Sequence, residues 1–307
     1  MTQKTAPTCT TRLIELPLTR LHIMESGNGL PLIIVPATIS QLENWVDLIQ
    51  FMAQWFHVYF FELPGHGLST PYREEFSTRR VAQTVGQLAD ALQMDRFNLM
   101  GFSFGGILAM RAYDLLQRRI DRLILTAPCL TNRAIRMSRF QKQVIRRANG
   151  WFRREAVKQR LLRAFHHSKQ RPILTDLLQL LAKFENRAQV EGKLATLQIS
   201  TLEVLTGEIA EIMDFEFLPP AMKFETPCYF TMSIYDPLLD YEITLQELQK
   251  NFANIHVTRL YFPFHQPPTP FTFDELNRDF GESIEMIFEN SMPYANTRGN
   301  ALVSANA

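Results

Sequence analysis

The chain has 307 residues, of which 46% are hydrophobic and 21% are charged, so it can build one large core and is neither disordered nor fibrous. Its net charge of +1 argues against nucleic-acid binding through bulk charge. Three widely spaced cysteines without a CxxC pair argue against a disulfide framework or a zinc ribbon. With no apolar leader and no apolar run of about 20 residues, we expect a cytoplasmic protein without a membrane-spanning segment.

The first half of the chain alternates strand-like and helix-like segments. Apolar and β-branched runs predict strands, whereas runs with helical periodicity predict the helices between them, one of them capped by Ser77. This alternation predicts a parallel sheet that is covered by helices on both faces. The expected strands are 11–16, 21–26, 30–35, 57–62, 97–101 and 122–127, and the expected helices are 41–55, 78–94 and 104–118.

The pattern changes after Pro128. Residues 130–220 read almost entirely as helix, after which strand-like segments return at 228–233 and 256–262 and a helix follows at 273–290. The changes in pattern predict four parts: an α/β core in two pieces, a helical cap inserted between its sixth and seventh strands, and a disordered tail. The two core pieces are residues 1–129 and 221–292, the cap is 130–220, and the tail is 293–307.

The sharpest motif is Gly101-Phe102-Ser103-Phe104-Gly105-Gly106, which follows a predicted strand and opens a predicted helix. A serine on so tight a turn is strained and needs small neighbours two positions before and after it. The turn lifts the serine Oγ out of the sheet and places helix N–H groups beside a developing oxyanion. The motif therefore predicts a nucleophilic serine, and the alternative is an ordinary strand-to-helix turn.

These residues resemble the nucleophile elbow of the α/β-hydrolase fold family, in its serine hydrolase branch with a helical cap. Segment 63–69, LPGHGLS, resembles the D-x-P-G-H-G-x-S segment of the family, with Glu62 where the family has Asp, and Trp45 matches a tryptophan on its first helix. The resemblance implies a doubly wound, mostly parallel, eight-stranded α/β sheet with the cap inserted after strand 6. It also implies chemistry that requires no cofactor and no metal.

In this family the catalytic triad runs nucleophile, acid, histidine along the chain. The resemblance therefore implies Ser103 as the nucleophile, Asp236 as the acid and His265 as the base, with Asp240 as a reserve for the acid. The alternatives are that Asp236 caps a helix or forms a turn and that His265 is a buried loop histidine. His66 is expected to organise its own loop rather than to act as a base.

The expected oxyanion loop departs from the family pattern. Pro36-Ala37-Thr38 stand where the family usually has His-Gly, and proline has no N–H to donate. By position, we expect the N–H groups of Thr38 and Phe104 to form the oxyanion hole. The departure favours a protein that binds a ligand without turnover, whereas the triad candidates favour an enzyme.

The cap sequence conceals a charge asymmetry. Between Arg133 and Arg171 there are 13 Lys and Arg and one acid, Glu155, which gives this segment a charge of +12 and leaves −11 for the rest of the chain. Apolar residues from Ile135 to Trp151 lie near helical spacing between arginines, which predicts a basic amphipathic helix. Such a helix is either a solvated face or attracts an anionic substrate, a carrier protein or a membrane surface.

Together these features predict a serine hydrolase that forms an acyl-enzyme and cleaves a carboxylic ester, as a carboxylesterase or lipase does. An apolar acyl group is expected because Phe102, Phe104 and Phe264 flank the predicted triad in a chain with 23 phenylalanines. Carbon–carbon bond hydrolysis, aminopeptidase action and ligand binding without catalysis are the alternatives. The expected partner is a small-molecule substrate and not a nucleic acid, and the sequence leaves the oligomeric state and the natural substrate open.

Overall fold

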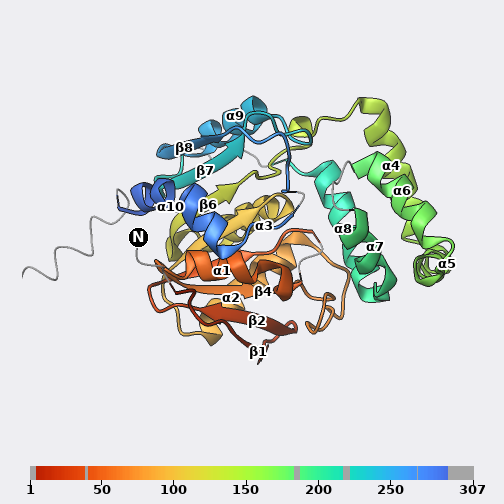
Figure 1. Ribbon diagram of the computed structural model, residues 1–307, viewed down its shortest axis with the longest axis horizontal. Coiled ribbons are helices and arrows are strands. Elements are labelled where there is room, and N and C mark those ends of the chain that lie inside the picture. The colour runs from red at the N-terminus through yellow and green to blue at the C-terminus, as the bar shows by residue number, and fades with distance from the viewer. Residues whose placement is uncertain (1–4, 39–40, 183–186, 217–221, 268, 290–307) are drawn as a thin grey trace, which may run out of the picture.

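A computed structural model describes residues 5–38, 41–182, 187–216, 222–267 and 269–289. Eight strands form one sheet in the order β1-β2-β4-β3-β5-β6-β7-β8 (Figure 1). The β1–β2 and β2–β4 pairs are antiparallel, and every pair from β4 to β8 is parallel, which confirms the predicted fold class. The strands are β1 Thr10–Glu15, β2 Arg20–Ser26, β3 Leu30–Val35, β4 Phe56–Phe61, β5 Phe97–Phe102, β6 Ile120–Thr126, β7 Cys228–Ser233 and β8 Ile255–Leu260.

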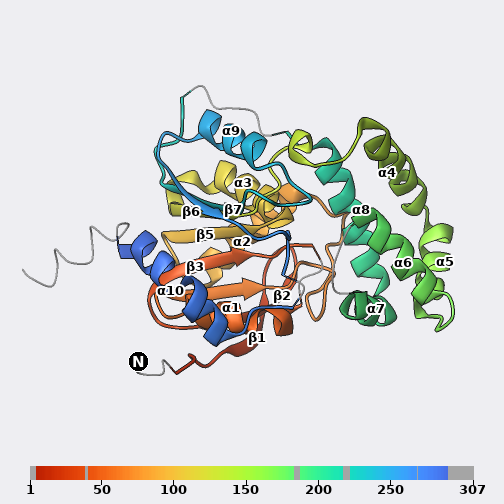
Figure 2. The ribbon, with the colours of Figure 1, turned by 45° about the horizontal axis from the view of Figure 1, so that its top comes forward.

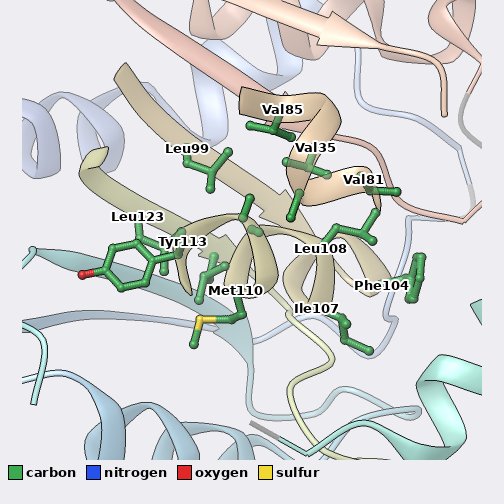
Figure 3. Close-up of a cluster of buried hydrophobic side chains, with 14 of the residues drawn as sticks. Val35, Val81, Val85, Leu99, Phe104, Ile107, Leu108, Met110, Tyr113 and Leu123 are labelled. Atoms are coloured by element: carbon green, nitrogen blue, oxygen red, sulfur yellow. The ribbon is translucent and has the colours of Figure 1, made fainter. Parts of the chain in front are cut away.

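Helices cover both faces of this sheet and enclose two apolar clusters. One cluster lies under α1 and α10, and the other lies under α2, α3 and α9 (Figure 1). In the second cluster the side chains of α3 interleave with those of α2 and of the central strands (Figure 3). The helices are α1 Val46–Met52, α2 Thr78–Ala91, α3 Phe104–Leu116, α9 Tyr241–Asn251 and α10 Phe273–Glu289, with short 3₁₀ turns at Leu42–Trp45, Gln117–Arg119 and Asn132–Ala134.

In the part of the chain that the structure describes, five helices follow β6 and precede β7. They lie together at one end of the molecule, with α8 nearest the sheet and α4, α5 and α6 beyond it (Figures 1 and 2). Four of them, α5 to α8, share a small apolar cluster around Phe165, Leu194, Leu197 and Leu202. These five helices, called the cap below, are α4 Arg139–Phe152, α5 Glu155–His166, α6 Arg171–Ala182, α7 Arg187–Ala195 and α8 Ile199–Asp214.

The basic amphipathic helix is shorter than its sequence pattern indicates. Ser138 accepts a hydrogen bond from the N–H of Gln141, whose side chain bonds back to Ser138, so this capping box starts α4 at Arg139. Ile135 lies before the helix, where it bridges to Leu239 and packs into the core. The predicted tail, 293–307, and the end of the predicted cap at 220 lie outside the described residues. No helix in the described part of the chain has the length and apolarity that crossing a bilayer requires.

Strand register brings the carboxyl ends of the central strands to one edge of the sheet. Val35 at the end of β3 lies opposite Gly101 on β5, Phe102 lies opposite Thr126 on β6, and Thr126 lies opposite Thr231 on β7. Loops that leave these strands therefore start side by side. Ligands bind at this edge in open α/β sheets, and the helices between β6 and β7 lie over it.

Candidate active site

Ser103 occupies the tight turn between β5 and α3. Its backbone angles are φ +49° and ψ −116°, a region that residues with side chains seldom adopt. A Cβ on Gly101 would lie 2.3 Å from the carbonyl oxygen of Gly105, and one on Gly105 would lie 2.8 Å from that of Val35. Only glycine fits at either position. The strained turn therefore depends on the small residues of the motif.

Three polar side chains from different loops meet at this turn. The Ser103 Oγ lies 2.8 Å from Nε2 of His265, and Nδ1 of His265 lies 2.6 Å from Oδ2 of Asp236. Asp236 follows β7 and His265 follows β8, so the register of adjacent strands brings them to the serine. The structure thus brings the three predicted triad residues into one hydrogen-bonded chain.

The Asp236 carboxylate also forms a turn, which was the alternative role predicted for it from the sequence. Its Oδ1 accepts the N–H groups of Leu238 and Leu239 at 2.8 and 2.9 Å, while Oδ2 faces His265. Burial raises the pKa of this carboxyl, but the hydrogen bonds from His265 and from the two N–H groups outweigh burial, and its pKa lies below its ordinary value. Asp236 is therefore held ionised and fixed in orientation.

Asp240, the reserve for the acid, has a different task. Its Oδ1 accepts the N–H of Ile243 at 3.1 Å and caps α9, and its Oδ2 lies 3.5 Å from the Arg136 guanidinium. A side chain engaged in this way stabilises the start of a helix. It is therefore Asp236, and not Asp240, that contacts His265.

The loop that carries His265 is held by its neighbours. Ser233 at the end of β7 donates a hydrogen bond from Oγ to the carbonyl oxygen of Phe262, at 2.6 Å. The rings of Phe262 and Phe264 stack with their centroids 5.2 Å apart. These contacts fix the residues that precede the histidine. Phe264, which replaces the glycine usual in the family, is thus accommodated by stacking.

The expected oxyanion loop lies against the start of α3. The close approach of Gly105 to the carbonyl oxygens of Val35 and Pro36 places this loop beside the serine turn. Ala37 is buried and Thr38 is exposed. The N–H of Phe104, the first residue of α3, has no acceptor within its own helix. The loop and the helix start thus lie next to each other at the serine turn.

A profile of the family described as the alpha/beta hydrolase fold matches residues 31–203, more than half of the chain. The chain belongs to the α/β hydrolase fold family. This match confirms the resemblance that the serine motif and the 62–69 segment indicated.

Curated relatives of this α/β hydrolase match over shorter segments. The chain is 29% identical to a pimeloyl-[acyl-carrier protein] methyl ester esterase of Nitrosomonas europaea over 37% of its own length and 44% of the relative. It is 29% identical to an N-formylmaleamate deformylase of Pseudomonas putida over 35% of its length and 40% of the relative. The chain therefore spans less than half of either relative.

Solved structures extend the likeness of fold over nearly the whole chain. A membrane phospholipase A described as a bacterial virulence factor superposes with a TM-score of 0.66 at 16% identity, over 94% of this chain and 87% of that one. A thermophilic esterase from Thermogutta terrifontis superposes with a TM-score of 0.64 at 17% identity, over 92% and 98%. At these identities the likeness concerns the fold.

The 62–69 segment of this α/β hydrolase is organised around the buried Glu62. Its Oε2 accepts the N–H of Leu68 at 2.8 Å and lies 3.0 Å from Nδ1 of His22. A Cβ on Gly67, whose φ is +51°, would lie within 2.2 Å of the same carboxylate. Glu62 therefore ties the loop to β2 and excludes any residue larger than glycine at position 67.

His66 lies inside this loop and does not reach the serine. Its N–H donates to the carbonyl oxygen of Leu63, and its own carbonyl oxygen accepts the N–H of Ser69. Neither ring nitrogen has a hydrogen-bond partner among the described residues, and burial lowers the pKa of His66 to about 4. Its backbone organises the loop, as the sequence indicated, and its ring fills space in the neutral form.

The cap helix α8 is fastened to the same loop. Ser200 and Thr201 each donate a side-chain hydrogen bond to the carbonyl oxygen of Gly65, at 3.0 and 2.9 Å. Gly65 has φ +93°, and a Cβ there would lie 2.8 Å from Cγ2 of Val204. The glycine thus lets the helix approach the loop directly.

Glu208, two turns after Thr201 on α8, is a buried carboxyl group without a partner among the described residues. Burial raises its pKa well above the ordinary value, because the charged form would lose its hydration without gaining a partner. The sequence pattern did not single out Glu208, because nothing in it separates this residue from the exposed Glu203 and the half-buried Glu211 of the same helix. The turn at Asp236 was among the alternatives for that residue, but its N–H donors, Leu238 and Leu239, were not predicted.

Proposed function

We propose that this α/β hydrolase is a serine hydrolase that cleaves carboxylic esters with an apolar acyl group. The observation that supports it most is the continuous chain from Ser103 Oγ through the His265 ring to Asp236, with distances of 2.8 and 2.6 Å. A serine hydroxyl is a weak nucleophile until a base and an orienting acid act on it. The proposal needs no cofactor or metal.

In the first half of the proposed reaction, Ser103 Oγ attacks the ester carbonyl carbon while Nε2 of His265 accepts its proton. Asp236 accepts the hydrogen bond from Nδ1–H, which fixes the tautomer and stabilises the imidazolium that forms. The N–H groups of Thr38 and Phe104 would donate to the oxyanion of the tetrahedral intermediate. The protonated His265 then gives its proton to the leaving alcohol, and Ser103 keeps the acyl group.

In the second half, water replaces the alcohol. His265 accepts a proton from the water, whose oxygen attacks the acyl carbon and forms a second oxyanion at the same donors. Collapse of this intermediate returns the proton to Ser103 and releases the acid. The low pKa of Asp236 keeps the carboxylate charged through both halves, so the imidazolium has a counter-charge whenever it forms.

The preference for an apolar acyl group rests on the aromatic side chains around the turn. Phe102 packs on the Trp45 ring with centroids 5.3 Å apart, and Phe264 stacks on Phe262. Phe104, the first residue of α3, is buried in the apolar cluster next to the turn (Figure 3). Cleavage of an ester, rather than another bond, is supported by the methyl ester esterase among the relatives.

A second candidate function is cleavage of an amide by the same three residues. It is favoured by the relative named N-formylmaleamate deformylase, which matches over a segment of similar length and identity to the esterase. Acyl transfer to serine serves both reactions, and they differ in the leaving group that His265 must protonate. The relative kcat/KM for an ester and an N-formyl amide with the same acyl chain separates the two.

The proposal is tested with short-chain and medium-chain p-nitrophenyl esters. We expect hydrolysis by the wild-type chain, and none above the uncatalysed rate by the Ser103→Ala variant. A fluorophosphonate probe should label Ser103 and no other serine, as judged by mass spectrometry of the digested protein. The exposed Ser168→Ala variant is the control, with unchanged turnover and labelling. A folded wild-type chain that is neither labelled nor active would instead support ligand binding without catalysis.

A further inference from the structure

The outer helix α4 leaves a row of large apolar side chains in the solvent. Phe140, Val144 and Trp151 are 73%, 46% and 53% exposed. Their spacing of four and seven residues places them on one face of the helix. The opposite face is used in packing: Ile145 contacts the core, and Asn149 donates to the carbonyl oxygen of Thr206 on α8 at 2.8 Å.

A second helix of the outer layer shows the same pattern. On α6, Ile173, Leu177 and Leu180 are 70%, 52% and 76% exposed, and their spacings of four and three residues also place them on one face. Exposed apolar residues scattered singly need no explanation, but rows of them on neighbouring elements mark interaction surfaces. Both helices lie in the layer of the cap that is farthest from the sheet (Figures 1 and 2).

The arginines beside the α4 row lack acidic partners. Arg139, Arg147 and Arg154 are exposed and form no salt bridge within the described part of the chain. By contrast, Arg146 pairs with Asp214 at 2.8 Å, and Arg153 pairs with Glu75 at 2.7 Å. The positive charge that faces outward is therefore not neutralised by the protein itself.

From these observations we infer that the outer face of the cap docks on a lipid bilayer that carries anionic headgroups. A helix with exposed Trp and Phe next to arginines is suited to the boundary between headgroups and acyl chains. Unpaired arginines gain from the negative surface potential of such a bilayer. The remainder of the chain carries −11 against +12 in residues 133–171, so an anionic surface attracts the cap and repels the core.

Two other occupants fit the surface less well. A second copy of the chain would bring the same unpaired arginines against one another, which opposes association. A protein partner would have to provide hollows for side chains that protrude from the rim of the molecule, whereas a bilayer admits them without a matching shape. The inference does not depend on the proposed catalysis, because the docking face and the Ser103 site share no residue.

Vesicle binding by the Ser103→Ala protein tests the inference without lipid turnover. We expect co-sedimentation with vesicles of equimolar phosphatidylcholine and phosphatidylglycerol, and much weaker binding to phosphatidylcholine alone. Replacing Arg139, Arg147 and Arg154 together by Gln should weaken binding roughly 100-fold, from the gain per basic residue at an anionic surface. Added salt should weaken it as well, since the Debye length falls from about 8 Å at 0.15 M to about 3 Å at 1 M.

The apolar row has its own readout. Trp151 is exposed, whereas Trp45 and Trp55 are half-buried. When vesicles bind, most of the blue shift in tryptophan fluorescence, and most of the quenching of this fluorescence by brominated lipid, should therefore come from Trp151. The Phe140→Ser/Trp151→Ser variant should lose vesicle binding by about tenfold or more. The matched control is Leu115→Ser on α3 of the core, which removes a side chain of 52% exposure and should leave binding unchanged.

Three outcomes would overturn the inference. The first is a folded protein that does not bind the anionic vesicles at low salt. The second is binding that the arginine and Phe140/Trp151 variants leave unchanged. The third is a wild-type dimer, seen by sedimentation velocity, that dissociates in the Phe140→Ser/Trp151→Ser variant, because the row would then be covered by a second copy.

Discussion

The edge of the sheet around Ser103 and the outer layer of the cap differ in how much each residue is constrained. At the edge, a single Cβ on Gly101 would lie 2.3 Å from a backbone oxygen, and the Asp236 carboxylate has a partner on each of its oxygens. In the outer layer, Gly150 on α4 has nothing within 4 Å of an added Cβ, and Phe140 is 73% exposed. Residues at the edge of the sheet are therefore restricted by close contacts, whereas residues of the outer layer can change without disturbing the packing.

The largest effect is expected at the acid of the triad. The Asp236→Asn variant should fold and lose about 10⁴-fold in kcat for a p-nitrophenyl ester, by analogy with the same change in a serine protease. Asp240→Asn is the matched control: asparagine keeps the Oδ1 that caps α9, so the variant should keep both its stability and its activity. Loss of activity in Asp240→Asn with retention in Asp236→Asn would contradict the assignment.

A smaller effect is expected from the oxyanion loop. Thr38→Pro removes one backbone N–H and should lower kcat by about 10²–10³-fold, the usual effect of losing one oxyanion donor. Thr38→Ala keeps the N–H and should retain most of the activity, while Ala37→Gly should be tolerated. If Thr38→Pro is as active as Thr38→Ala, the oxyanion is stabilised by other groups.

Two glycine substitutions, one beside the active-site edge and one in the outer layer of the cap, compare how strongly each region affects the free energy of unfolding. Gly67→Ala places a Cβ against the buried Glu62 carboxylate at φ +51° and should lower the free energy of unfolding by about 1–3 kcal/mol. Gly150→Ala, in open space within α4, should raise it by up to about 1 kcal/mol. Urea unfolding of both variants measures the difference. If both substitutions change the free energy of unfolding equally and in the same direction, the two regions do not differ in how tightly their residues are constrained.

The smallest effect is a change in how stability depends on pH. The pKa of Glu208 is raised in the folded chain, so the native state holds a proton that the unfolded chain releases above its ordinary carboxyl pKa. Stability from this group is therefore present at low pH and is lost as pH rises toward the folded pKa. Glu208→Gln removes this dependence, so its Tm should rise relative to that of the wild type as the pH rises above the ordinary carboxyl pKa of about 4.3.

The sequence predicted most of the fold and the three residues of the candidate triad, because their signals are local. A glycine-flanked serine between a strand and a helix and a histidine after the last strand are visible along the chain. Helix limits were less accurate: the predicted helix 41–55 is a 3₁₀ turn followed by a helix of seven residues, Val46–Met52. Tertiary packing against β4 and α10, which no local pattern records, fixes these limits.

Features of the cap that depend on contacts between distant segments could not be predicted. The bonds from Ser200 and Thr201 to Gly65 join residues more than 130 positions apart. The exposure of the α4 row also depends on which face of the helix packs inward, and an amphipathic pattern alone suggests that the apolar face is buried. Here Asn149 and Arg146 lie on the packed side beside Ile145, because α8 offers them carbonyl and carboxylate oxygens.

The contact between Gly65 and Val204 has a consequence for the history of the family. Since a Cβ at position 65 would lie 2.8 Å from Cγ2 of Val204, the sizes of these two residues are coupled across the boundary between core and cap. A lineage that exchanges its cap must preserve a small residue at one position or make room at the other. Amino acids at 65 and 204 should therefore covary among relatives that keep α8 in this place, whereas those at 140 and 151 are free to follow the surface that each enzyme meets.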